Sequence, residues 1–138
     1  MKRIIFIMGF VLLVSSSFAQ TPPVAVKNTF EQKFPAATNI KWGKESASEW
    51  EAEFKMNSAK NSANFLADGN WVETETEIPV AQLPAGVVIS IKKQYPAAEI
   101  VGAHKIETAQ KGTMYEADIK TGGKKKEVVL TADGTFIK

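Results

Sequence analysis

The chain has 138 residues, a formal net charge of +2 and no cysteine. This length suits one ordinary domain or two very small ones. Without cysteine the protein has neither disulfide bonds nor a catalytic thiol, so its stability must come from the burial of apolar side chains.

The first 19 residues have the composition of a secretory signal peptide. Lys2 and Arg3 form a positively charged start, and an apolar run follows over residues 4–14. Ser17 and Ala19 place small side chains at positions −3 and −1 of a cleavage site after Ala19. The alternative is a membrane anchor, but a spanning helix needs about 20 apolar residues and this run is about half as long. The sequence therefore predicts export to the periplasm or secretion, with no membrane span after cleavage.

The predicted leader contains two of the 17 basic residues and none of the 15 acidic ones, so the rest of the chain is formally neutral. A neutral protein gives no electrostatic reason to expect binding to nucleic acid or to an anionic membrane. Because two very small domains without disulfides would be only marginally stable, we expect the two halves to share a core or a continuous sheet.

Three short motifs occur twice, in the same order. The distance between the copies is 61 positions for the first motif and 65 for the other two. The pairs are Phe-Pro-Ala-Ala and Tyr-Pro-Ala-Ala (34–37 and 95–98), Trp-Glu-Ala-Glu-Phe and Tyr-Glu-Ala-Asp-Ile (50–54 and 115–119), and Ala-Asp-Gly (67–69 and 132–134). Ordered matches at nearly constant distance rarely arise by chance, so the sequence predicts two tandem copies of one unit, over residues 20–78 and 79–138.

Each copy begins with a pattern that is typical of an amphipathic surface helix. Apolar residues recur at positions i, i+4 and i+8 beside charged ones, which gives a single apolar stripe. Pro23 and Pro84 suit the first turn of these helices, and Pro35 and Pro96 end them. The stripes consist of Val26, Phe30 and Phe34 in the first copy and of Val87, Ile91 and Tyr95 in the second.

After each helix the pattern changes to the alternation that is typical of strands. Asp-Gly and Gly-Gly pairs between the alternating runs indicate tight hairpins. The predicted fold is therefore α+β, with two tandem α-β-β-β-β units, each a helix packed on a four-stranded antiparallel sheet. The predicted strands span residues 40–44, 50–56, 63–67, 70–76, 100–108, 114–121, 125–132 and 135–138.

These motifs resemble those of the PepSY-like family, which is also described as β-lactamase-inhibitor-like. The resemblance depends on the Pro-Ala-Ala motif after each helix, the aromatic-Glu-Ala-acidic strand and the Ala-Asp-Gly turn, and it covers residues 24–138. It implies an exported envelope protein with two helix-and-sheet units side by side, and a curved sheet whose open face grips a protein. It implies no catalytic residues. The chain lacks the cysteines of the secreted inhibitor itself, so the resemblance alone does not imply inhibition.

The turn at residues 68–69 decides which strand face is open. If it is a two-residue turn, Phe65 pairs with Val72, and both face the helix. Trp71 and its counterpart Phe136 then lie on the opposite, open face. The alternative is a bulged turn, which reverses the alternation and buries Trp71.

The same alternation turns two acids in the second strand of each copy away from the helices. Exposed rings suit protein recognition because they bury a large area at a small entropic cost. The alternative is that the rings cover a sheet end or the seam between the copies. The candidate binding residues on the open face are Trp71, Phe136, Glu51, Glu53, Glu116 and Asp118.

The leading hypothesis is a non-enzymatic binding module that contacts an envelope or secreted protein or peptide, inhibition included, through the open face. The alternative is a periplasmic sensor of a small ligand or a divalent cation, since hard cations accept clustered carboxylates. Catalysis is not expected, because the single histidine, His104, leaves no nucleophile–base pair. His104 also has no second histidine at ligand spacing, so the sequence predicts no metal site and no cofactor.

Overall fold

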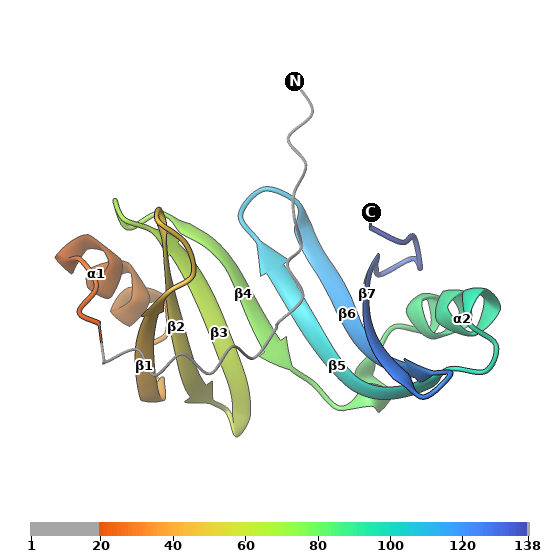
Figure 1. The fold of residues 1–138 in the computed structure, drawn as a ribbon. Helices are drawn as coiled ribbons and strands as arrows, with labels where there is room; N and C mark the ends of the chain where they lie inside the picture. Colours follow the sequence, from red (N-terminus) through yellow and green to blue (C-terminus); the bar gives the residue numbers. More distant parts are fainter. Residues whose placement is uncertain (1–19, 138) are drawn as a thin grey trace.

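The computed structural model describes residues 20–137, so the signal peptide predicted for residues 1–19 lies outside the described part. In this part the chain forms one antiparallel sheet of seven strands in sequence order, with two α-helices on its outer flanks, one at each end (Figure 1). None of the described helices is long and apolar enough to cross a membrane. The elements are α1 (Val24–Lys33), β1 (Thr38–Lys44), β2 (Glu49–Met56), β3 (Ala59–Leu66), β4 (Trp71–Glu77), the 3-10 helix η1 (Val80–Gln82), α2 (Ala85–Gln94), β5 (Glu99–Thr108), β6 (Gly112–Thr121) and β7 (Lys124–Thr131).

The apolar stripe of α1 packs on the first half of the sheet. Val26 and Phe30 are buried, and the Phe30 ring lies edge to face with the ring of Phe54, with 5.1 Å between the centroids. Pro35 ends the helix, because the residue before a proline avoids the helical conformation; Phe34 accordingly has a φ of −129°. The buried cluster consists of Val26, Phe30, Phe34, Ala52, Phe54, Ala63 and Phe65.

Helix α2 covers the second half of the sheet in the same way. Val87 and Ile91 face the sheet and are fully buried. The helix ends at Tyr95 before Pro96, as α1 ends before its proline. The second buried cluster consists of Leu83, Val87, Ile91, Ala103, Ala117, Ile119, Val128 and Leu130.

Strands β4 and β5 join the two halves into one sheet. They pair from Glu73 opposite Thr108 to Glu77 opposite His104. The expectation that the halves share a continuous sheet is therefore confirmed. The prediction of two four-stranded units is not supported, because the described residues form one domain with seven strands. The predicted boundary at 78–79 falls between β4 and η1.

The hairpin between β3 and β4 is not the two-residue turn on which the open face was predicted. Its loop has three residues, since the N–H of Leu66 donates to the carbonyl oxygen of Asn70 at 2.8 Å. The loop ends at Gly69, which has a φ of +94°, and a three-residue loop with a left-handed last residue carries a bulge. Phe65 consequently pairs with Trp71. The predicted pairing is thus wrong, and the bulged alternative is the one that the structure shows.

The end of the chain repeats this geometry. The N–H of Thr131 donates to the carbonyl oxygen of Thr135 at 2.9 Å, and Gly134 has a φ of +92°. Leu130 then forms an isolated bridge with Phe136. Within the described residues this bridge stands in place of the strand predicted over residues 135–138, so that prediction is also wrong.

Candidate functional site

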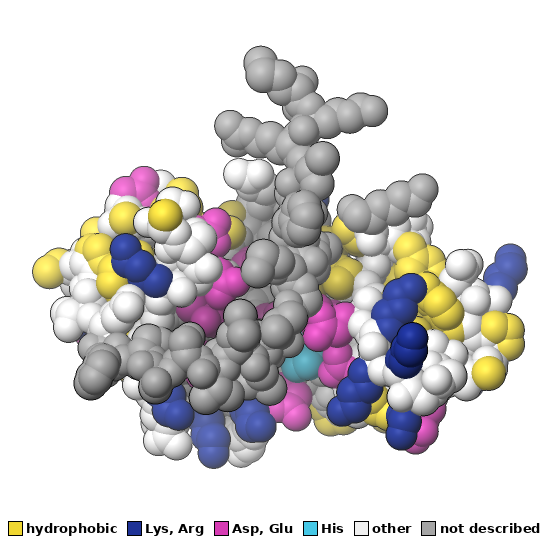
Figure 2. Space-filling model, in the orientation of Figure 1, with side chains coloured by type: hydrophobic (Ala, Val, Ile, Leu, Met, Phe, Trp, Pro, Cys, Tyr) yellow, Lys and Arg dark blue, Asp and Glu magenta, His cyan; other side chains and the backbone are white. Residues whose placement is uncertain are grey.

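The sheet face opposite the helices is hollowed and acidic. Figure 2 shows acidic side chains gathered in the hollow between the two flanks, next to the histidine, with lysines along the lower rim. The hollow is an open groove with a volume of about 1000 Å³. The acidic residues that line it are Glu53, Glu75, Glu77, Glu116, Asp118 and Glu127.

The four acids predicted for this face do lie there. Glu51 and Glu53 flank Ala52, which is buried on the helix side, and Glu116 and Asp118 flank Ala117 in the same way. Glu53, Glu116 and Asp118 line the groove. Their part in binding stays a prediction.

The two aromatic residues predicted for the open face are instead on the helix side. Trp71 packs against the α1 cluster, with the Nζ of Lys33 at 3.8 Å from its ring centroid and its Nε1–H donating to Thr74 Oγ1 at 2.9 Å. Phe136 packs against the α2 cluster, with its ring centroid 6.3 Å from that of Tyr95. Each three-residue loop has one residue more than the predicted two-residue turn, and this additional residue causes the reversal. The open face therefore has no aromatic pair at these positions.

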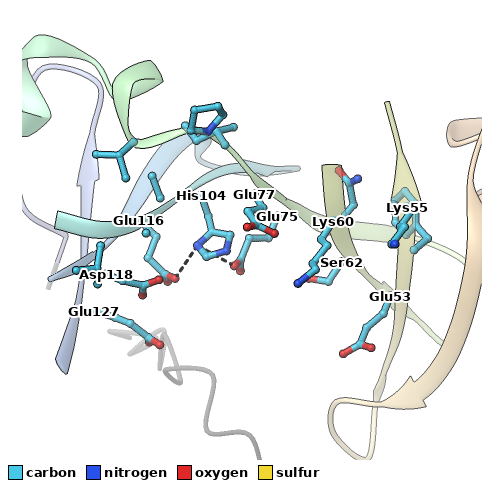
Figure 3. Close-up of a pocket in the computed structure, with 18 of the residues that line it drawn as sticks. Glu53, Lys55, Lys60, Ser62, Glu75, Glu77, His104, Glu116, Asp118 and Glu127 are labelled. Atoms are coloured by element: carbon cyan, nitrogen blue, oxygen red, sulfur yellow. Dashed lines mark ion pairs between the residues drawn. The ribbon is translucent and has the colours of Figure 1, made fainter. Parts of the chain in front are cut away.

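Three titratable side chains from adjacent strands meet at the centre of the groove. His104 in β5 lies between Glu75 of β4 and Glu116 of β6 (Figure 3). Its Nδ1 is 3.7 Å from Oε1 of Glu75 and 3.5 Å from Oε1 of Glu116. Both distances exceed those of ordinary hydrogen bonds, and Nδ1 is buried without a hydrogen-bond partner among the described residues. We call Glu75, His104 and Glu116 the histidine cluster.

Burial and mutual repulsion change the ionisation of this cluster. Burial is the main cause that raises the pKa of Glu75 to about 7; the charge of Glu116 raises it further, and His104 opposes the shift. The approach of Glu116 raises the pKa of His104, with a further contribution from the charge of Glu75, whereas burial lowers it. Close to neutral pH the cluster can therefore hold or release a proton.

The acidic face extends beyond this cluster toward β2. Burial raises the pKa of Glu51 to about 7, and the charges of Glu45 and Glu53 add to the shift. Burial also raises the pKa of Glu73, followed by the charges of Glu49 and Glu45. The carboxylates thus repel one another, and the face favours a cationic ligand.

Replacement of Glu51 by glutamine should stabilise the protein above neutral pH. Because the folded pKa of about 7 exceeds the ordinary value of 4.5, the folded state binds more protons between these values and loses stability as the pH rises through them. Glutamine removes this loss, and solvent screening limits the gain to about 1 kcal/mol. Urea unfolding of the wild type and the Glu51→Gln variant at pH 5 and pH 8 measures this gain in the free energy of unfolding. An equal effect of the substitution at both pH values would contradict the argument.

Sequence reasoning missed His104 and Glu75 as parts of the site. The alternation of β4 does turn Glu73, Glu75 and Glu77 toward the open face, but no sequence spacing connects them with His104. The proximity arises from the pairing of β4 with β5. A second set, Glu116, Asp118 and Glu127, shares Glu116 with the histidine cluster, and within each set the ligand atoms lie within 4.8 Å of one another.

Solved structures share this architecture. The chain is similar to a BLIP-like protein from Bacteroides fragilis, with a TM-score of 0.74, 22% identity, and coverage of 86% of this chain and 85% of that one. For a protein from Bacteroides eggerthii, described as "putative periplasmic", the TM-score is 0.78 at 17% identity. The match covers 86% of this chain and 88% of that one. A DUF2874 family protein from Bacteroides ovatus gives 0.76 at 22% identity and covers 86% of both chains. These likenesses establish a fold of the β-lactamase-inhibitor-protein-like (BLIP-like) type.

The sequence itself establishes the family. A family model described as "Putative beta-lactamase-inhibitor-like, PepSY-like" matches residues 48–138, which is more than half of the chain. The chain therefore belongs to this PepSY-like family. No curated protein has a significant sequence match to the chain.

Proposed function

We propose that the protein is an exported, non-enzymatic binding module that holds a protein or peptide partner against the open face of its sheet. The observation that carries this proposal is the acid-lined groove of about 1000 Å³ on the face that both helices leave uncovered. Burial, with added repulsion between the carboxylates, already raises the pKa of Glu51 and Glu75 in this face. A partner with lysine or arginine side chains would relieve the repulsion, so we infer a basic segment as the ligand.

The relatives support export and binding. The similar Bacteroides eggerthii protein is described as "putative periplasmic", which agrees with the signal peptide predicted for residues 1–19. The family and the Bacteroides fragilis protein are described by their likeness to an inhibitor, and an inhibitor acts by binding another protein. We infer a periplasmic or secreted location, and inhibition as one form that the binding takes.

Crosslinked affinity capture from the native envelope tests this function. The double substitution Glu51→Gln/Glu53→Gln removes two open-face charges and should lower recovery of the partner about tenfold, which corresponds to about 1.4 kcal/mol. The matched control is Glu31→Gln/Glu107→Gln, which removes two exposed carboxylates outside the open face. Equal recovery with both variants, or a loss with the control alone, would contradict binding through the open face.

A second candidate function is the sensing of a small ligand or a divalent cation by the same face. It is favoured by the two sets of side chains that share Glu116, each with ligand atoms within 4.8 Å of one another. Hard cations accept clustered carboxylates as ligands. Titration of the protein with Ca²⁺, Mg²⁺ and Zn²⁺ tests this function, which fails if none of them raises the melting temperature.

A further inference from the structure

We propose that Glu75, His104 and Glu116 form a binding site for a divalent transition-metal ion such as Zn²⁺, with one carboxylate oxygen from each glutamate and Nδ1 of the histidine as ligands. The inference rests on the second candidate function and gives that function its ligand class.

The sheet fixes the positions of the three side chains. His104 and Glu116 are direct cross-strand partners in β5 and β6, and Glu75 lies in β4, diagonally across from His104, whose partner in β4 is Glu77. Ligands on adjacent paired strands are held more rigidly than ligands on loops. The side chain of Glu116 is only 9% exposed, whereas those of His104 and Glu75 are 25% and 31% exposed. The three side chains are therefore partly buried in the groove wall, and His104 and Glu75 remain accessible to an ion.

The distances suit a bridging ion better than direct hydrogen bonds. Nδ1 of His104 is 3.5 Å from Glu116 and 3.7 Å from Glu75. Hydrogen bonds between nitrogen and oxygen are shorter, at about 2.7–3.2 Å. In a tetrahedral zinc site with bonds of about 2.1 Å, neighbouring ligand atoms lie about 3.4 Å apart. The two distances from Nδ1 are thus close to the spacing of neighbouring ligands on one ion, and all three ligand atoms lie within 4.8 Å of one another.

The buried Nδ1 atom is the independent sign of a ligand. It has no hydrogen-bond partner among the described residues, and its two ion-pair contacts, with Glu75 and Glu116, are longer than hydrogen bonds. A metal ion between His104 and the two carboxylates would supply the missing partner. It would also neutralise the repulsion between Glu75 and Glu116.

The ligand atoms select the class of metal. An imidazole nitrogen suits Zn²⁺ and other first-row transition metals, while Ca²⁺ takes six to eight oxygen ligands. Three protein ligands leave a fourth position free in a tetrahedral site. Water or a side chain of a bound partner would complete the coordination.

Isothermal titration of the exported protein with zinc chloride tests the site. We expect one Zn²⁺ per chain, and more than about tenfold weaker affinity after His104→Ala or Glu116→Gln. Glu53→Gln, a carboxylate on the same face outside the cluster, is the matched control and should change the affinity less than about twofold. Substitution with Co²⁺ should give visible ligand-field absorption bands that depend on His104.

Two outcomes would overturn the site. Absence of Zn²⁺ binding by the folded wild-type protein is one, and equal Zn²⁺ affinity in the wild type and the His104→Ala variant is the other. Urea unfolding without metal shows whether the variants remain folded, and His104→Gln serves if the alanine variant does not. If the protein binds Ca²⁺ with the same affinity in the wild type and in the His104→Ala variant, and binds no Zn²⁺, the proposed site is overturned. The cation-sensing function is then left intact.

Discussion

Replacement of Phe30 by alanine should lower the free energy of unfolding by about 3–5 kcal/mol. The side chain is 2% exposed, and its ring centroid lies 5.1 Å from those of both Trp42 and Phe54 and 5.4 Å from that of Phe34. Alanine would leave a cavity that these rings cannot fill, because each is held by the sheet or the helix end. Chemical denaturation with urea measures the loss.

The shape of that unfolding curve is informative as well. Because β4 and β5 join both halves into one sheet, we expect a single transition whose midpoint moves as a whole. Val24→Ala is the control, since Val24 is 73% exposed on the same helix, and it should change stability by less than about 0.5 kcal/mol. Two separate transitions in the Phe30 variant would show that the halves unfold independently.

Replacement of Gly134 by alanine should destabilise the protein by about 3 kcal/mol. The residue has a φ of +92°, and a Cβ atom there would collide with the carbonyl oxygen of Gly86 and with Ser90 Oγ in α2. Backbone strain and overpacking each cost roughly 1–3 kcal/mol. The turn after β7 would have to move away from the start of α2 to accommodate the methyl group.

Gly122→Ala is the matched control for this effect. Gly122 also has a positive φ, of +56°, but nothing lies within 4 Å of a Cβ at that position. Alanine there should cost about 1–2 kcal/mol, from backbone strain alone. Thermal unfolding of the two variants compares the costs directly. If they are equal, the close approach between the turn and α2 does not contribute to stability.

The helices and the Gly-Gly hairpin tip could be predicted from the sequence because their signals are local. Five residues of the i, i+4, i+8 stripes are buried as expected, and Tyr95 is partly buried against the α2 cluster. The tip at Gly122 and Gly123, with φ of 56° and 75°, is the expected two-residue turn. Each signal depends on residues within one turn or one helix face, so no tertiary information was needed.

The sheet face on which the Trp71 side chain lies could not be decided from the sequence. An Asp-Gly pair fits a two-residue turn as well as the last two positions of a three-residue loop. The second is formed here, and one additional loop residue reverses the face of the residue that follows. Phe136 changes sides for the same reason, so one local ambiguity misplaced both predicted aromatic binding residues.

The acidic face was largely predictable, whereas the histidine cluster was not. Alternation around the buried residues Ala52 and Ala117 correctly placed two acids of each second strand on the open face. The meeting of Glu75 with His104 depends on the register between β4 and β5. That register is formed between one strand of each half, so the sequence of either half alone does not determine it.

The most direct measurement of the central claim, that the open sheet face is the binding surface, uses a photo-crosslinking residue at two positions. Ser62 lines the groove between its strand partners Glu53 and Glu75, and Ile89 is 65% exposed on α2. After irradiation in the native envelope, we predict that the residue at position 62 forms a partner adduct and the residue at position 89 does not. An adduct from position 89 with none from position 62 would contradict the proposed binding surface.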